Sequence, residues 1–84
     1  MYRIYGKVIK EYWFGEAHHL PQSTFRALTR GGSQVTRLAN AHCYDTIEEA
    51  QAVIDRAKKN LKKNGHEDCV LFEIRKAWYY VFNI

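Results

Sequence analysis

Histidine and cysteine carry the most varied chemistry in this chain, and they fall into three short groups: His18–His19, His42–Cys43 and the stretch HEDC from His66 to Cys69. Structural zinc sites take paired ligands from two chain segments, with two to four residues between the members of a pair. Only His66 and Cys69 have such a spacing. Neighbours on a strand point to opposite faces, which argues against a thiol–imidazole pair of His42 with Cys43. We therefore expect no metal site, no cofactor and no enzymatic activity.

Arginines flank two adjacent glycines in the stretch TRGGSQVTR, residues 29–37. Gly31-Gly32 favours a two-residue hairpin turn, because such turns require positive φ angles that glycine adopts without a Cβ clash. That turn would place Arg30 opposite Ser33 and Arg26 opposite Arg37, with the three arginines on one face. Guanidinium groups bind carboxylates and phosphates through paired hydrogen bonds. The alternative is an ordinary hairpin with solvated arginines, and the stretch lacks the spacing of a P-loop.

Aromatic residues are abundant, with six Tyr, four Phe and two Trp. One thin core cannot easily bury all of them, and aromatic side chains beside arginine anchor protein interfaces or stack on single-stranded nucleic acid. Extra packing in the last strand or a dimer interface is the alternative. We predict that six residues bind a partner or an anion: Arg26, Arg30, Arg37, Trp13, Trp78 and Tyr80. The sequence leaves open whether Tyr79 or Tyr80 faces the helix, because a bulge would exchange them.

Alternation of apolar and polar residues predicts a first strand from Tyr2 to Trp13, and Gly15 and Pro21 predict a loop over residues 15–22. The hairpin would comprise strands from about Ser23 to Arg30 and from Ser33 toward Leu38. Residues 41–44 either extend the second of these strands or form a short one of their own.

Three- and four-residue spacing predicts an amphipathic helix with its apolar face formed by Ile47, Ala50, Ile54, Ala57 and Leu61. Asp45 or Thr46 would cap its start, and Gly65 would end it. Val70, Phe72 and Ile74 then alternate with polar residues in a last strand that runs into the aromatic residues 78–82.

These elements predict an α+β fold, with an antiparallel sheet of four or five strands and one helix packed on one face in the order ββ(β)βαβ. The 84 residues are enough for a single domain over 1–84. The sheet face opposite the helix would be uncovered in a monomer, so a homodimer is a further possibility.

The net charge of +4 is unevenly distributed. Residues 1–42 contain six Arg or Lys against two Glu, whereas residues 43–84 contain seven residues of each sign. An acidic partner would therefore meet the N-terminal half first.

The longest apolar stretch, residues 77–82, is far shorter than the roughly 20 residues that cross a bilayer. We expect a cytoplasmic protein without membrane contact.

The run FRALTRGGSQVTRLANAHCYDTIEEAQAVIDRAKKN, followed by VLFEIRKAW, resembles a pattern of small phage-encoded accessory proteins. In that pattern a glycine-turned hairpin leads to an aromatic residue, a helix start of the type S/T-x-E-E-A and a final strand of the type y-E-I-r-k. The pattern contains no catalytic residues. The resemblance implies an origin in a phage or mobile element, where many such proteins, the anti-CRISPR proteins among them, bind and disable a host or defence protein.

The sequence thus predicts a small non-enzymatic binding protein that inhibits a host or defence complex, in a bacterial cytoplasm, by occupying a binding surface. The alternative is a nucleic-acid or nucleotide binding module that uses the same arginines and aromatic residues.

Overall fold

The computed structural model describes residues 1–77, and within them the chain forms one α-helix and two antiparallel sheets. The elements are β1 (Tyr2–Val8), β2 (Lys10–Trp13), β3 (Glu16–His19), β4 (Arg26–Ala27), the 3-10 helix η1 (Leu38–Asn40), α1 (Ile47–Lys63) and β5 (Val70–Lys76). One sheet has the strand order β4-β1-β5 and the other pairs β2 with β3. The predicted α+β class is confirmed, whereas the predicted single sheet of four or five strands is wrong.

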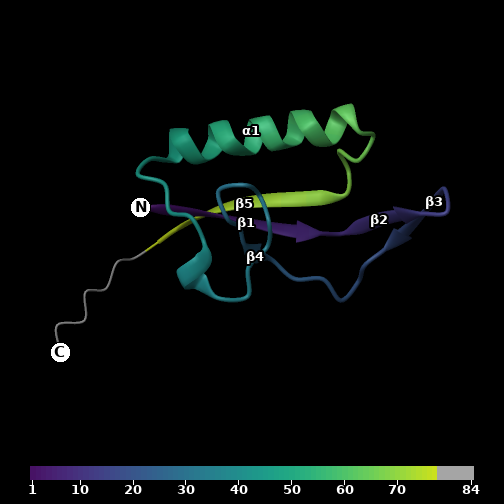
Figure 1. Ribbon diagram of the computed structural model, residues 1–84, viewed down its shortest axis with the longest axis horizontal. Coiled ribbons are helices and arrows are strands. Elements are labelled where there is room, and N and C mark those ends of the chain that lie inside the picture. The colour runs from purple at the N-terminus through teal and green to yellow at the C-terminus, as the bar shows by residue number, and fades with distance from the viewer. Residues whose placement is uncertain (78–84) are drawn as a thin grey trace.

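A break in strand pairing near Ile9 separates the two sheets. The backbone N–H groups of Ile9 and Lys10 both donate to the Cys69 carbonyl, at 2.8 and 3.4 Å. Two residues opposite one is the pattern of a β-bulge, and it ends the pairing with β5. In Figure 1 the chain runs on in the same direction into β2, which pairs with β3. The predicted strand over residues 2–13 is therefore two strands, and the predicted loop over residues 15–22 contains β3.

The helix packs along β1 and β5, as Figure 1 shows. Its N-cap is Thr46, whose hydroxyl accepts a hydrogen bond from the Glu49 N–H at 3.1 Å. Acidic residues in the first turn and lysines in the last complement the helix dipole. The buried core cluster consists of Ile4, Leu28, Tyr44, Ala50 and Ile54. No helix in residues 1–77 has the length and apolar character needed to cross a membrane.

The predicted hairpin around Gly31-Gly32 has a different register from the expected one. Leu28 pairs with Gln34, and the Thr29 N–H donates to the Ser33 carbonyl at 2.9 Å. The turn therefore contains three residues, 30–32, instead of two. A one-residue shift in register exchanges the faces on which side chains lie. Gln34 instead of Val35 therefore lies opposite Leu28, and Arg26 and Arg37 are not a cross-strand pair.

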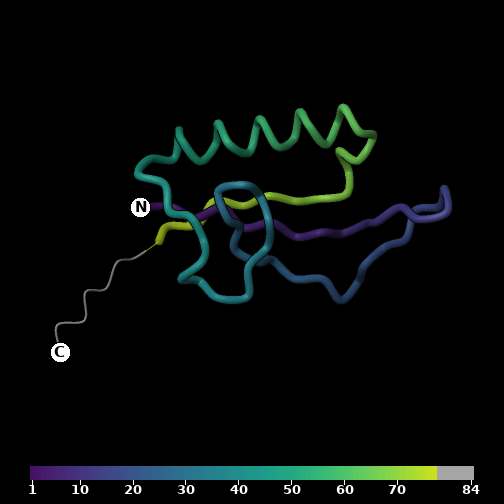
Figure 2. The backbone as a smooth tube through the Cα atoms, viewed as in Figure 1, coloured from purple at the N-terminus to yellow at the C-terminus, as the bar shows by residue number. Residues whose placement is uncertain are grey.

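Regular pairing in this region is short, because β4 has two residues and the predicted strand from Ser33 toward Leu38 is a single bridge followed by η1. Figure 2 shows the chain between β4 and α1 as wide loops. Residues 41–44 do not extend this hairpin. Instead Tyr44 forms an isolated antiparallel bridge with Tyr2, which fixes the approach to α1.

Candidate functional site

The β2–β3 hairpin ends in a two-residue turn formed by Phe14 and Gly15. Trp13 pairs with Glu16 on either side of the turn. Both turn residues have positive φ angles, 54° for Phe14 and 74° for Gly15, as a type I′ turn requires. Glycine adopts this conformation readily, but a phenylalanine there is strained by about 1–2 kcal/mol. The strained side chain is also 98% exposed, so none of its apolar surface is used to hold the described fold together.

Two further aromatic side chains stand next to Phe14 on opposite faces of the hairpin. Trp13 is 42% exposed and stacks on His18, with the ring centroids 3.8 Å apart and the planes 3° from parallel. Tyr12 is 43% exposed and stacks on His66 at 5.6 Å. The histidine ring in each stack holds the Trp13 or Tyr12 ring in one orientation, and part of that ring remains exposed to solvent. We call residues 12–14 the aromatic tip.

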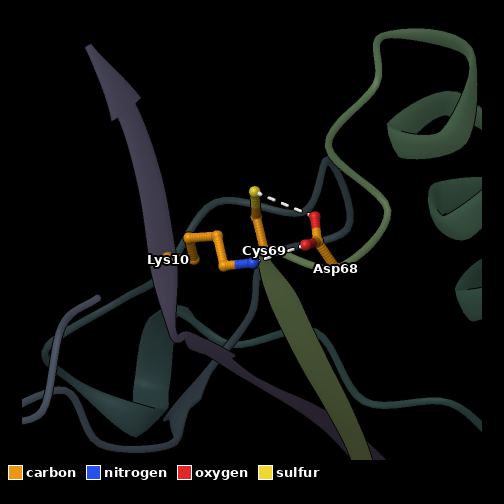
Figure 3. Close-up of polar contacts among 3 residues, drawn as sticks. All are labelled: Lys10, Asp68 and Cys69. Atoms are coloured by element: carbon orange, nitrogen blue, oxygen red, sulfur yellow. Dashed lines mark hydrogen bonds and ion pairs between the residues drawn. The ribbon is translucent and has the colours of Figure 1, made fainter. Parts of the chain in front are cut away.

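The base of the hairpin is tied to the segment that precedes β5. The Lys10 ammonium lies 2.6 Å from one carboxylate oxygen of Asp68, and the Cys69 thiol donates to the other at 3.8 Å (Figure 3). The hydrogen bond from Lys10 lowers the pKa of Asp68, and the same bond raises the pKa of Lys10. Both groups are therefore charged at neutral pH. Together with the Tyr12–His66 stack, this ion pair links the hairpin to the end of α1.

Burial raises the pKa of the Cys69 thiol, and the neighbouring negative charge of Asp68 raises it further. The thiol is thus protonated at neutral pH, which suits its role as a donor to Asp68. Reactive cysteines require the opposite effect, a lowered pKa in a positive environment. In residues 1–77 no three or more His, Cys, Asp or Glu side chains gather in a group able to hold a metal ion.

A second cluster of side chains, in which Glu73 and Arg75 are exposed and Arg3, Tyr5 and Phe25 are half-buried, lies on the sheet face opposite α1. The Arg75 guanidinium lies 4.2 Å from the centroid of the Tyr5 ring and 5.6 Å from that of Phe25. Arg75 also forms an ion pair with Glu73 at 2.8 Å. Arg3 pairs directly across from Arg75, which concentrates positive charge. We call these five residues the cationic sheet face.

The six residues predicted from the sequence do not form one surface. Arg26 lies on β4 opposite Gly6, and Arg30 lies in the three-residue turn, where it lines a hollow beside α1. Arg37 precedes η1. Trp13 belongs to the aromatic tip, and Trp78 and Tyr80 lie outside the described residues.

The site residues predicted from the sequence do not include Phe14, Tyr5 or Arg75. The signal for Phe14 was present in WFGE, an aromatic-glycine pair between two short stretches able to pair. The predicted loop begins at Gly15 instead, because both Gly15 and Pro21 favour a loop over residues 15–22. Tyr5 and Arg75 lie far apart in the sequence, and only the register of β1 with β5 brings them together.

Comparisons of this chain with protein-family models, with curated proteins and with solved structures find no match.

Proposed function

We propose that this protein is a non-enzymatic binding protein that inserts its aromatic tip into an apolar pocket of a protein partner and inhibits that partner by occupying the pocket. Following the resemblance described above, the partner is a host or defence protein of a bacterium. The observation that carries the proposal is Phe14, a fully exposed phenylalanine held in a strained turn beside Trp13.

Strain at an exposed apolar residue supports a binding role. Asn, Asp or Gly would form this turn at lower cost, so Phe14 lowers stability without burying apolar surface in the described residues. Burying a phenylalanine side chain against a partner contributes about 1.5–3 kcal/mol. Aromatic residues in such pockets dominate the binding energy of many interfaces.

The orientation of the β2–β3 hairpin is also fixed by contacts within this chain before any partner binds. The Lys10–Asp68 ion pair and the Tyr12–His66 stack orient the hairpin, so little conformational entropy remains to be lost on association. Trp13 and Glu16 form a cross-strand pair, as do Glu11 and His18, so both glutamates share a face with Trp13. The partner pocket should therefore be apolar inside and basic at the rim beside Trp13.

Affinity capture from a nuclease-treated bacterial lysate tests this proposal. We expect a stoichiometric protein to be captured by wild type and to be lost with Phe14→Ala or Trp13→Ala. With the purified partner, Phe14→Ala should weaken binding by a factor of about 10–100, the equivalent of one buried phenylalanine side chain.

The matched control is Ile47→Ala, since Ile47 is also an exposed apolar residue, at 49%, but begins α1 at the end of the molecule away from the hairpin (Figure 1). This variant should capture the partner as wild type does. Equal capture by wild type, Phe14→Ala and Trp13→Ala would contradict the proposal.

The second candidate function is nucleic-acid binding through the cationic sheet face. It is favoured by the placement of Arg75 near the rings of Tyr5 and Phe25, with Arg3 opposite it, because rings stack on bases and arginines contact phosphates. In this case the captured material would be nucleic acid and would disappear after nuclease treatment. Arg75→Ala would then reduce the slope of log affinity against log salt concentration by about one unit.

A further inference from the structure

A hollow of about 440 Å³ lies between the three-residue turn and the first half of α1. It is lined by residues from three separate segments: Arg30, His42, Tyr44, Glu49, Ala52, Val53 and Arg56. Its volume falls within the range of sites that bind small molecules. We call it the Arg30–Arg56 pocket.

Two arginines face this pocket without an acidic partner. Neither Arg30 nor Arg56 forms an ion pair with another of residues 1–77. Two positive charges that face a common hollow repel each other. An oxyanion between them would remove this repulsion, and the guanidinium group is well shaped to bind phosphate through two hydrogen bonds.

Tyr44 lines the same pocket and carries a buried hydroxyl group close enough to Arg30 and Arg56 to respond to their charges. The residue is 6% exposed, and its hydroxyl oxygen is buried without a hydrogen-bond partner among residues 1–77. Buried hydroxyl groups without a partner are uncommon because they lose their bonds to water. Burial raises the pKa of Tyr44, and the positive charges of Arg30 and Arg56 lower it in part. The phenol is therefore neutral at neutral pH and can donate a hydrogen bond to an anion.

The segment that carries Tyr44 is held by the backbone on both sides. Tyr44 and Tyr2 exchange backbone hydrogen bonds of 2.8 and 2.7 Å, and the His42 N–H donates to the Leu28 carbonyl at 3.1 Å. The His42 ring meets the Tyr44 ring edge-on, with 4.6 Å between the centroids. The phenol is thereby fixed in place before any ligand binds, which favours a built site over an accidental hollow.

Glu49 makes the pocket selective. It lies two helical turns before Arg56 and supplies a carboxylate acceptor among the cations. A bare anion would be repelled by it, whereas a ligand that also carries a hydroxyl group would donate to it.

We infer that the Arg30–Arg56 pocket binds a phosphate monoester that carries a hydroxyl group, such as the sugar phosphate part of a nucleotide. Arg30 and Arg56 bind the phosphate, the Tyr44 hydroxyl donates to a phosphate oxygen, and Glu49 accepts from the ligand hydroxyl. This site does not depend on the aromatic tip, so either proposal can fail alone.

Isothermal titration calorimetry at constant ionic strength tests the inference with four probes: inorganic phosphate, ribose 5-phosphate, AMP and ribose. We expect ribose 5-phosphate to bind more tightly than inorganic phosphate, and ribose to give no heat. Binding of AMP at least as tight as that of ribose 5-phosphate would identify a nucleotide as the source, and weaker binding a sugar phosphate. Arg30→Ala and Arg56→Ala should each weaken binding about tenfold or more, because each removes a charged hydrogen-bonding group.

Arg37→Ala is the matched control, because it removes the same charge from the same segment at a residue that does not line the pocket. An equal loss of affinity in Arg37→Ala and Arg30→Ala would overturn the inference and leave only a net-charge effect. Absence of heat with both phosphate esters would overturn it as well. Tyr44→Phe keeps the buried ring and removes only the hydroxyl, so a folded Tyr44→Phe protein with unchanged affinity would overturn the role of the phenol.

Discussion

Two glycine-containing turns in this chain both differ from the structure predicted for them, and they differ in opposite directions. The Gly31-Gly32 pair appeared suited to a two-residue hairpin, yet it lies in a three-residue turn with little strand pairing beyond it. Gly15 is the first residue of a predicted loop, yet with Phe14 it forms the two-residue turn between two four-residue strands. Of the first pair only Gly32 has a positive φ, 92°, whereas both residues of the second do.

The difference shows that pairing beyond a turn selects its type. Leu28 belongs to the buried core cluster with Ile4 and forms a bridge with Gln34. The Gln34 side-chain amide also donates to the Gly6 carbonyl of β1 at 3.0 Å, which supports this register. With this bridge three residues remain for the turn, although two adjacent glycines could by themselves form a two-residue turn. No comparable burial constrains Phe14, so the twist of β2 and β3 selects the primed turn despite its cost.

Leu28→Ala should have the largest effect, because it removes a large side chain from the buried core beside the three-residue turn. The unfolding free energy should fall by about 2–4 kcal/mol. Urea unfolding measures it, and Leu38→Ala is the control since Leu38 is exposed on η1. If both variants lost the same stability, burial of Leu28 would not explain the loss.

Gly32→Ala should have the next largest effect. Alanine at a φ of 92° would be strained, and we expect a loss of about 1–2 kcal/mol in unfolding free energy. Gly31→Ala is the matched control, because its φ is not positive and an added Cβ would meet only the Thr29 side chain at 3.9 Å. Thermal unfolding measures the stability of both variants. If Gly31→Ala lowered stability as much as Gly32→Ala, both glycines would require a positive φ, as in a two-residue primed turn.

Phe14→Asn should separate stability from binding at the other turn. Asparagine tolerates the left-handed conformation, so the variant should gain roughly 0.5–1 kcal/mol, a part of the strain at Phe14. At the same time it should lose the captured partner, as Phe14→Ala does. A variant that is less stable than wild type would mean that Phe14 supports the fold.

Asp68→Asn should have the smallest effect and should depend on pH. Because the folded-state pKa of Asp68 is lowered, its ion pair with Lys10 contributes stability above the usual carboxyl range. That contribution is lost as the pH falls through the folded-state pKa. Urea unfolding over an acidic pH series should show wild type and Asp68→Asn converging at low pH. Parallel curves would show that the pair contributes nothing to stability.

Much of the fold could be predicted because it depends on local patterns. The helix, its Thr46 cap and β5 follow from periodicity and capping chemistry that lie within a few residues of one another. The strand break at Ile9 could not be predicted, because it depends on the Cys69 carbonyl, sixty residues away. Of the candidate site residues, Trp13 lies on the aromatic tip, while the grouping of Arg26 with Arg37 failed with the register.

The sequence by itself determined the α+β class, the boundaries of α1 and the abundance of arginine and aromatic side chains, since spacing and composition are local properties. Only the tertiary structure decided which of these side chains lie together. Arg30 and Arg56 line the same pocket, Arg75 lies over Tyr5, and Phe14 is exposed beside Trp13 at a hairpin tip. The physical reason is that a one-residue change in strand register exchanges the faces of a sheet, and each register depends on pairing between residues far apart in the sequence, such as Tyr5 with Glu73.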